Sequence, residues 1–210
     1  MEYVSRREID ESVDLFKQVV HRVQCDCGKD GLAFDYYLVG SASHNLVVPH
    51  HNKGYDLDYQ LFLKRNVAEL STKSVKDTIR LSFDRYMPES FDCAEDSTSA
   101  ITIKKKNGDH ILVSYDIVIL RSNNAGNVEI LRRTGFNQDI RYIWNLLPKS
   151  IDYEKKLRVI SDAGLMEELR KVYYKKKQAK NSGVNYTDRK SFQILNEAVN
   201  EVLGKHNIHY

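Results

Sequence analysis

The stretch from Ser99 to Leu120 constrains the fold more than any other part of the chain. It reads SAITIKKKNGDHILVSYDIVIL, in which two runs of β-branched residues are separated by Asn107-Gly108. Asn-Gly is the strongest short-range signal for a β-hairpin, because the tight turn needs positive φ at both of its central residues. This part of the chain is therefore predicted to be antiparallel β-structure.

The rest of the chain mixes strand and helix patterns. Apolar spacing predicts a helix over about 8–23, ending before a CDCGKDG loop, and a second helix that begins at Ser71 or Ser74 and stops at Pro88. Residues 34–40, FDYYLVG, and residues 56–63 read as strands. From about residue 139 the pattern turns helical, in DIRYIWNLL, then in AGLMEELRKVYYKKK and in a last helix around residues 192–202.

These elements predict an α+β fold, with a mixed or antiparallel sheet flanked by helices and a C-terminal helical region. We expect a catalytic domain over residues 1–136 and a helical region over residues 137–210, within one compact unit. The chain has 210 residues, of which 41% are hydrophobic, enough for one substantial core.

Charge and cysteine content narrow the class of protein. The formal net charge of +3 indicates neither a nucleic-acid coat protein nor a strongly acidic one. No stretch approaches the roughly 20 apolar residues of a membrane helix, so we expect a soluble, cytoplasmic protein. The three cysteines are an odd number in a chain of this size, which indicates reduced thiols. Cys25 and Cys27 are either half of a zinc site or part of a plain loop, and the lack of a second cysteine pair favours the loop.

Two aspartates interrupt the apolar strand over residues 56–63. Asp56 and Asp58 are two residues apart, so in a strand their side chains point to the same side, about 6.6 Å apart along the backbone. Their repulsion is costly away from water unless a cation compensates it, and Mg²⁺ takes such oxygen ligands. The alternative is the polar face of a solvated edge strand. Asp116, in the second run of the hairpin, supplies a third acid and favours the metal.

A glycine-serine turn lies upstream of these aspartates. Gly40-Ser41 ends the apolar run of residues 34–39, where backbone N–H groups and a hydroxyl can bind a phosphate. Together with Asp56-x-Asp58 and Asp116, this turn resembles the signature of the nucleotidyltransferase superfamily, which has the DNA polymerase β-like fold. The resemblance covers roughly residues 35–120.

The resemblance implies roles for these residues. Asp56, Asp58 and Asp116 would be the catalytic residues and the ligands of two Mg²⁺ ions, with Mn²⁺ as an alternative. Gly40 and Ser41 would bind the β- and γ-phosphates of a nucleoside triphosphate such as ATP. Asp116 would also help to activate the acceptor hydroxyl. The stretch between the turn and Asp56, ASHNLVVPHHNKGY, departs from the usual pattern of the family.

Several other polar residues are either part of the site or ordinary solvent-exposed residues. Lys53 is a further nucleotide-binding candidate, and the histidines near the turn, at positions 44, 50 and 51, either touch a nucleotide or belong to a solvated loop. Lys76 and Arg80 share a helical face and are expected to be exposed. The segment KVYYKKKQAK, residues 171–180, either contacts a nucleotide or is a solvated helix end.

The expected function is Mg²⁺-dependent transfer of a nucleoside monophosphate from a nucleoside triphosphate to a hydroxyl, with release of pyrophosphate. The acceptor is left open among RNA, a small molecule and a nucleotide, and no membrane partner is expected. The alternative is a catalytically silent nucleotide- or RNA-binding module, antitoxin-like or regulatory, on the same fold.

Overall fold

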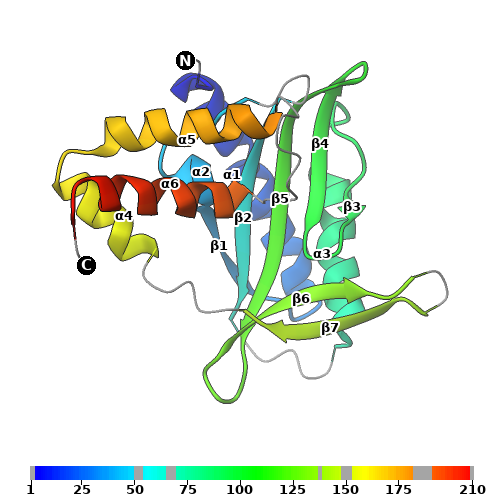
Figure 1. Cartoon of the computed structure of the whole chain (residues 1–210). Helices are drawn as coiled ribbons and strands as arrows, with labels where there is room; N and C mark the ends of the chain where they lie inside the picture. Colours follow the sequence, from blue (N-terminus) through cyan, green and yellow to red (C-terminus); the bar gives the residue numbers. More distant parts are fainter. Residues whose placement is uncertain are drawn as a thin grey trace.

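The computed structural model describes residues 3–49, 54–64, 70–136, 139–147, 153–181 and 191–208, and it shows an α+β fold built on one seven-stranded sheet (Figure 1). The strands are β1 (Phe34–Val39), β2 (Tyr55–Leu63), β3 (Glu95–Asp96), β4 (Ile101–Asn107), β5 (His110–Ser122), β6 (Val128–Thr134) and β7 (Arg141–Leu146). The helices are α1 (Arg6–Lys29), α2 (Gly40–Ser43), α3 (Thr72–Tyr86), α4 (Tyr153–Asp162), α5 (Met166–Asn181) and α6 (Ser191–Lys205). The predicted fold class is confirmed.

The sheet is mixed, with one parallel pair at its centre. Its strand order is β1-β2-β5-β4-β3; β2 and β5 run parallel, and the other pairs are antiparallel. The predicted hairpin is β4–β5, but its turn is shifted by one residue: Asn107 pairs with His110, so the two turn residues are Gly108 and Asp109, and of these only Gly108 has a positive φ, of +58°. Alternate β2 side chains are buried along the whole strand, as an apolar-polar alternation requires.

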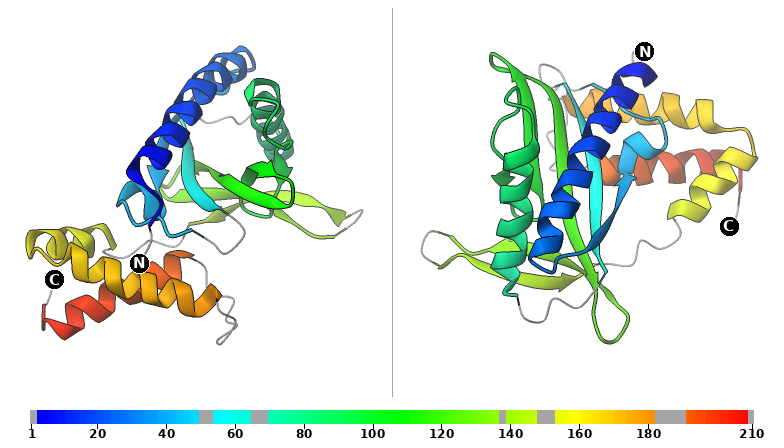
Figure 2. Two further views of the ribbon diagram at one scale, coloured as in Figure 1. Left: turned by 90° about the horizontal axis from the view of Figure 1, so that it is seen from above. Right: turned by 180° about the vertical axis from the view of Figure 1, so that it is seen from behind.

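Helices α1 and α3 cover one face of the sheet (Figure 2). Helix α1 starts at a capping box formed by Ser5 and Glu8, and it packs Phe16 in a stack on Tyr59 of β2, with ring centroids 3.6 Å apart. The predicted end of this helix was wrong, because α1 continues to Lys29 through the segment expected to be a loop. Cys27 extends the apolar stripe of the helix by one more turn and is fully buried, so its burial favours helix over loop.

Helix α3 follows the predicted boundaries but holds a buried cation. Ser71 caps its first turn, and the helix ends just before Pro88. Lys76 was expected to be exposed and is instead only 1% exposed, because its Nζ atom lies 2.6 Å from the Asp96 carboxylate and donates to the Ser97 carbonyl at 2.6 Å. A buried lysine is stable only with such partners.

The hairpin β6–β7 replaces a helix that the sequence predicted. The apolar spacing of residues 139–147 indicated a helix, but residues 141–146 form strand β7, which is antiparallel to β6. Trp144 and Tyr142 alternate along β7 and pack against the main core, and the Arg121 guanidinium lies 4.2 Å from the centre of the Trp144 ring. Packing of these aromatic side chains therefore overrides the helical spacing.

Helices α4, α5 and α6 form a separate layer on the opposite face of the sheet, as Figure 2 shows. The helices predicted around residues 163–177 and 192–202 are confirmed as α5 and α6. They enclose a second core with Tyr173 and Val199, and Leu46 and Val48 from the stretch after the glycine-serine turn join it. Val47, between them, belongs to the main core. The stretch that departs from the family pattern therefore connects the two cores. Within the described residues, no helix has the length and apolarity needed to cross a bilayer.

Candidate active site

The central feature of the candidate site is a pair of aspartates on the two parallel strands. Asp58 of β2 lies directly opposite Asp116 of β5, and Asp56 lies opposite Ser114. Residues paired in this way point to the same face of a sheet, so the register gathers all three predicted acids on one face. This face is the one covered in part by the C-terminal helices.

The glycine-serine turn lies against the same pair. Val39, the last residue of β1, is paired with Asp58, so the next residue, Gly40, begins the turn beside this carboxylate. Gly40 has φ +68°, and a Cβ atom at this position would lie 2.5 Å from Oδ2 of Asp58. Any side chain here would collide with the carboxylate, and the positive φ is itself unfavourable for other residues. The turn and the aspartate therefore require glycine at this position.

Burial controls the ionisation of the two central acids. Burial is the largest cause of the raised pKa of Asp58, which reaches about 7; the carboxylates of Asp116 and Asp56 act in the same direction, and Lys177 opposes them. Burial also raises the pKa of Asp116, which is lowered in turn by a hydrogen bond from the Thr102 hydroxyl at 2.7 Å. Like charges that share a poorly solvated site need a cation to remain ionised together.

Helix α5 supplies two buried polar side chains to the site. Tyr173 and Lys177 are one helical turn apart, and they are 0% and 4% exposed. The Tyr173 hydroxyl is hydrogen-bonded to Ser41, and Lys177 acts electrostatically on Asp58. Figure 1 shows how α5 crosses the sheet near the ends of β2 and β5. Sequence reasoning treated the segment over residues 171–180 as a whole. Spacing alone does not single out this pair, because Tyr174 and Lys177 also lie on one helical face.

The remaining candidates divide between described and undescribed parts of the chain. Lys53, His50 and His51 lie outside the described residues. His44 is described, and it faces α4, where its Nε2 atom lies 3.8 Å from the Glu154 carboxylate and its ring meets the Tyr153 ring edge-on. His44 therefore connects the turn to the C-terminal helices.

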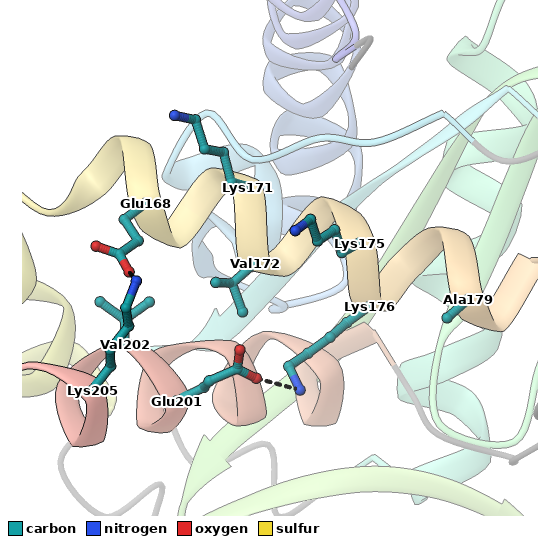
Figure 3. Close-up of a pocket in the computed structure, with 9 residues that line it drawn as sticks. All are labelled: Glu168, Lys171, Val172, Lys175, Lys176, Ala179, Glu201, Val202 and Lys205. Atoms are coloured by element: carbon teal, nitrogen blue, oxygen red, sulfur yellow. Dashed lines mark hydrogen bonds and ion pairs between the residues drawn. The ribbon is translucent and has the colours of Figure 1, made fainter.

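A groove lies elsewhere, between α5 and α6 (Figure 3). It has a volume of about 790 Å³. Figure 3 shows Lys176 and Glu201 pointing toward each other across it, with an Nζ–carboxylate distance of 2.8 Å, and Lys205 reaching Glu168 at 2.5 Å. Four of its charged side chains pair with one another and no acid of the β2–β5 pair lines it, so the aspartates remain the candidate site.

The fit of a metal to these residues rests on the chemistry of the donor set. In the residues that the structure describes, no group of three or more His, Cys, Asp or Glu side chains is already arranged to hold a metal ion, so a metal at the three aspartates would have to draw their carboxylates together. The three acids offer oxygen ligands only, which is the donor type that Mg²⁺ takes in proteins. Their shared face and the raised pKa of Asp58 give a cation a clear electrostatic reason to bind there.

Comparisons with known proteins identify solved structures of the same fold. No protein-family model matches the chain, and no curated protein sequence does. Among solved structures, Escherichia coli DncV bound to 3′-deoxy GTP matches with a TM-score of 0.67 and 14% identity, over 95% of this chain and 68% of that one. Vibrio cholerae DncV bound to GTP matches with a TM-score of 0.62 and 15% identity, over 99% of this chain and 53% of that one. At these identities the similarity shows a shared fold.

Proposed function

We propose that this chain, which has the fold of the DNA polymerase β-like nucleotidyltransferases, transfers a nucleoside monophosphate from a nucleoside triphosphate to a hydroxyl group. Pyrophosphate is the second product. The observation that carries the proposal is the register of β2 on β5, which sets Asp58 opposite Asp116 with Gly40 against the Asp58 carboxylate. Carboxylates and a phosphate-binding turn are the two parts that this chemistry requires.

The three aspartates would hold the metal. Asp56, Asp58 and Asp116 present carboxylate oxygens on one face, and Mg²⁺, or Mn²⁺ in its place, is the ion that suits them. When bound, the ion supplies positive charge that stabilises the triphosphate and favours ionisation of the attacking hydroxyl. The buried site makes that charge effective because little water screens it.

The turn and helix α5 would bind the triphosphate. Gly40 and Ser41 offer backbone N–H groups and a hydroxyl, and Lys177 brings a buried ammonium to the same region. Lys53, which lies outside the described residues, stays a prediction as a further phosphate ligand. Tyr173, which is hydrogen-bonded to Ser41, would hold this hydroxyl in place beside the phosphates. In this proposal residues 137–210 supply the second wall of the cleft through α5, and residues 1–136 supply the catalytic acids.

The reaction is a single displacement at phosphorus. The acceptor oxygen forms a bond to the α-phosphorus while the bond from this phosphorus to the α,β-bridging oxygen breaks, and the bridging oxygen leaves with the pyrophosphate. The acceptor proton passes toward the carboxylate of Asp116. No covalent intermediate with a side chain is needed, so the protein acts by positioning charge and reactants.

A nucleotide hydroxyl is the first acceptor to test. Vibrio cholerae DncV is named as a cyclic AMP-GMP synthase, and one of its structures, which matches this chain with a TM-score of 0.58 and 16% identity, holds the linear intermediate 5′ pppA(3′,5′)pG. This chain spans 47% of that protein in the match. The proposal for this chain is therefore limited to the transfer step and to a nucleotide as its acceptor.

The test is an incubation of the protein with each labelled ribonucleoside triphosphate, with Mg²⁺ or with a chelator. Acceptors are the triphosphates themselves, tRNA, short RNA and small hydroxyl compounds. We expect a labelled product and stoichiometric pyrophosphate only with Mg²⁺. Metal-dependent binding of a triphosphate with no pyrophosphate from any acceptor would instead support the catalytically silent module, and absence of binding would contradict both.

A further inference from the structure

Strand β4 brings a threonine hydroxyl to the side of the aspartate pair. Thr102 of β4 is paired with Asp116 of β5, on the side opposite Asp58. Asp116 therefore stands on the middle strand between an acid and a threonine. The Thr102 hydroxyl donates to Oδ1 of Asp116 at 2.7 Å, and Thr102 is only 8% exposed. A short hydrogen bond to an ionised carboxylate in a buried position fixes the carboxylate strongly.

The hydrogen bonds behind Thr102 have a defined direction. The Thr102 hydroxyl has one proton, and it donates this proton to Asp116. The Ser97 hydroxyl lies 3.1 Å from the Thr102 oxygen, and it must therefore be the donor of this second bond. Hydrogen bonds arranged head to tail in this way polarise and strengthen one another. The result is a two-hydroxyl relay that ends on a single carboxylate oxygen.

The outer end of the relay is anchored by a buried ion pair. The Ser97 carbonyl accepts from Nζ of Lys76, which is also paired with Asp96 at 2.6 Å. Asp96 accepts in addition from the Tyr142 hydroxyl at 2.6 Å. Lys76 is the buried cation that the sequence did not predict, and through this contact it holds the backbone from which the relay starts. The relay therefore does not depend on mobile surface side chains.

We propose that Thr102 is a positioning residue for Asp116: it occupies Oδ1 and turns Oδ2 toward Asp58, the side on which a divalent cation would bind. This inference rests on the proposed function, because it assigns Asp116 to the metal. Outer partners of metal-ligating carboxylates typically contribute about 10- to 100-fold to metal affinity or activity. Thr102 touches neither substrate nor metal in this role and acts only through Asp116.

The experiment uses the full chain and four variants, of which Ser97→Ala removes the outer donor of the relay. Thr102→Val keeps the shape and removes the hydroxyl, Thr102→Ser restores a hydroxyl, and Thr134→Val is the control. The Thr134 hydroxyl makes only a 3.4 Å bond to a carbonyl on the exposed β6–β7 hairpin. Mn²⁺ affinity without nucleotide is measured by calorimetry, and kcat and KM for the triphosphate are measured with Mg²⁺. Thermal melting in a chelator shows whether each variant folds.

We expect Thr102→Val to weaken Mn²⁺ binding and to lower kcat, each by about 10-fold or more, with KM for the triphosphate nearly unchanged. Thr102→Ser and Thr134→Val should stay within about twofold of the wild type in Mn²⁺ affinity. Ser97→Ala, which removes the outer donor, should change the same quantities in the same direction but less. If Thr102→Val is unfolded, Ser97→Ala decides the outcome in its place.

Three other results are distinguishable. A wild-type protein that binds Mn²⁺ and releases pyrophosphate, with Thr102→Val equal to it in both, overturns the positioning role and leaves the proposed function standing. A wild-type protein that binds no Mn²⁺ and releases no pyrophosphate overturns both. Equal losses in Thr102→Val and Thr102→Ser would show a packing role and also overturn the inference, since serine restores the hydroxyl but not the methyl group.

Discussion

Asp58 and Asp116 occupy paired positions on two neighbouring parallel strands, with partly buried carboxyl groups on the same face of the sheet. Neighbouring strands are only about 4.8 Å apart, so the two acids cannot both ionise cheaply without a cation. A fold that keeps such a pair loses stability at neutral pH unless a ligand compensates it. Stability, metal binding and activity should therefore all depend on the ionisation of this pair.

Asp58→Asn should stabilise the metal-free protein at pH 7.5. The amide has nearly the shape of the acid but carries no charge, so the repulsion from Asp116 and Asp56 and the cost of burying a charge both disappear. The measurement is urea unfolding in a chelator. Gln60→Glu, which adds an acid two residues further along the same strand, is the matched opposite and should not stabilise. A clear loss of stability in Asp58→Asn would contradict the repulsion.

Stability without metal should fall as the pH rises from about 4 to about 7. The pKa of Asp58 is raised from 3.8 to about 7, so in this window the folded state binds a proton that the unfolded state has released. The folded state therefore loses stability as the pH rises, by about 4 kcal/mol at most from this group. Asp58→Asn should flatten the curve, and Asp116, whose pKa burial also raises, should retain a part of the slope.

Mg²⁺ should reverse this loss above pH 7. A ligand that binds only the folded protein stabilises it according to its concentration relative to Kd, and a cation binds the ionised carboxylates best. The measurement is thermal melting at pH 8, without Mg²⁺ and with Mg²⁺ concentrations raised in 10-fold steps. The melting midpoint is expected to rise with Mg²⁺ in the wild type and to change little in Asp58→Asn. Equal shifts in both proteins would place the metal elsewhere.

Gly40→Ala should both destabilise the fold and abolish activity. The added methyl group would lie 2.5 Å from Oδ2 of Asp58, at a residue with φ +68°. Gly126→Ala is the matched control, because Gly126 has φ +76° but a Cβ atom there would meet nothing within 4 Å. The control isolates the backbone cost, of the order of 1 kcal/mol. In urea unfolding, the loss of unfolding free energy in Gly40→Ala should be at least twice the loss in Gly126→Ala. Equal losses in the two variants would show that the contact with Asp58 is unimportant.

Lys177→Met should raise KM for the triphosphate by about 10-fold or more, because it removes a buried ammonium from the phosphate side of the site. The exposed neighbour Lys175 provides the control, and Lys175→Met should leave KM within about twofold. Steady-state kinetics over a range of triphosphate concentrations separates KM from kcat. A fall in kcat with KM unchanged would contradict a role of Lys177 in binding the triphosphate.

The candidate acids were predictable because their signal is local. Apolar alternation fixed the strand and face of Asp56 and Asp58, and the Asn107-Gly108 turn located the hairpin that carries Asp116. The strand pairing that sets Asp58 against Asp116 is a long-range property, and only the structure shows it.

Thr102 shows where sequence reasoning stops. The register shifts by one residue between Lys105 and Lys106, so counting back from the Asn107–His110 pair would place Ile101 opposite Asp116. This bulge instead brings Thr102 opposite Asp116. No pattern of residues in the sequence predicts the bulge. The prediction for strand β7 was wrong for a related reason. The helical spacing of residues 139–147 gave no sign that Trp144 and Tyr142 pack against the main core.

Pyrophosphate release is the most direct test of the proposed catalytic centre. The wild-type protein, Asp58→Asn and Gln60→Glu are incubated with each ribonucleoside triphosphate and Mg²⁺, and pyrophosphate is followed over time. We expect release by the wild type and by Gln60→Glu, and none by a folded Asp58→Asn. Pyrophosphate release by Asp58→Asn at the wild-type rate would contradict the assignment of Asp58 to the catalytic centre.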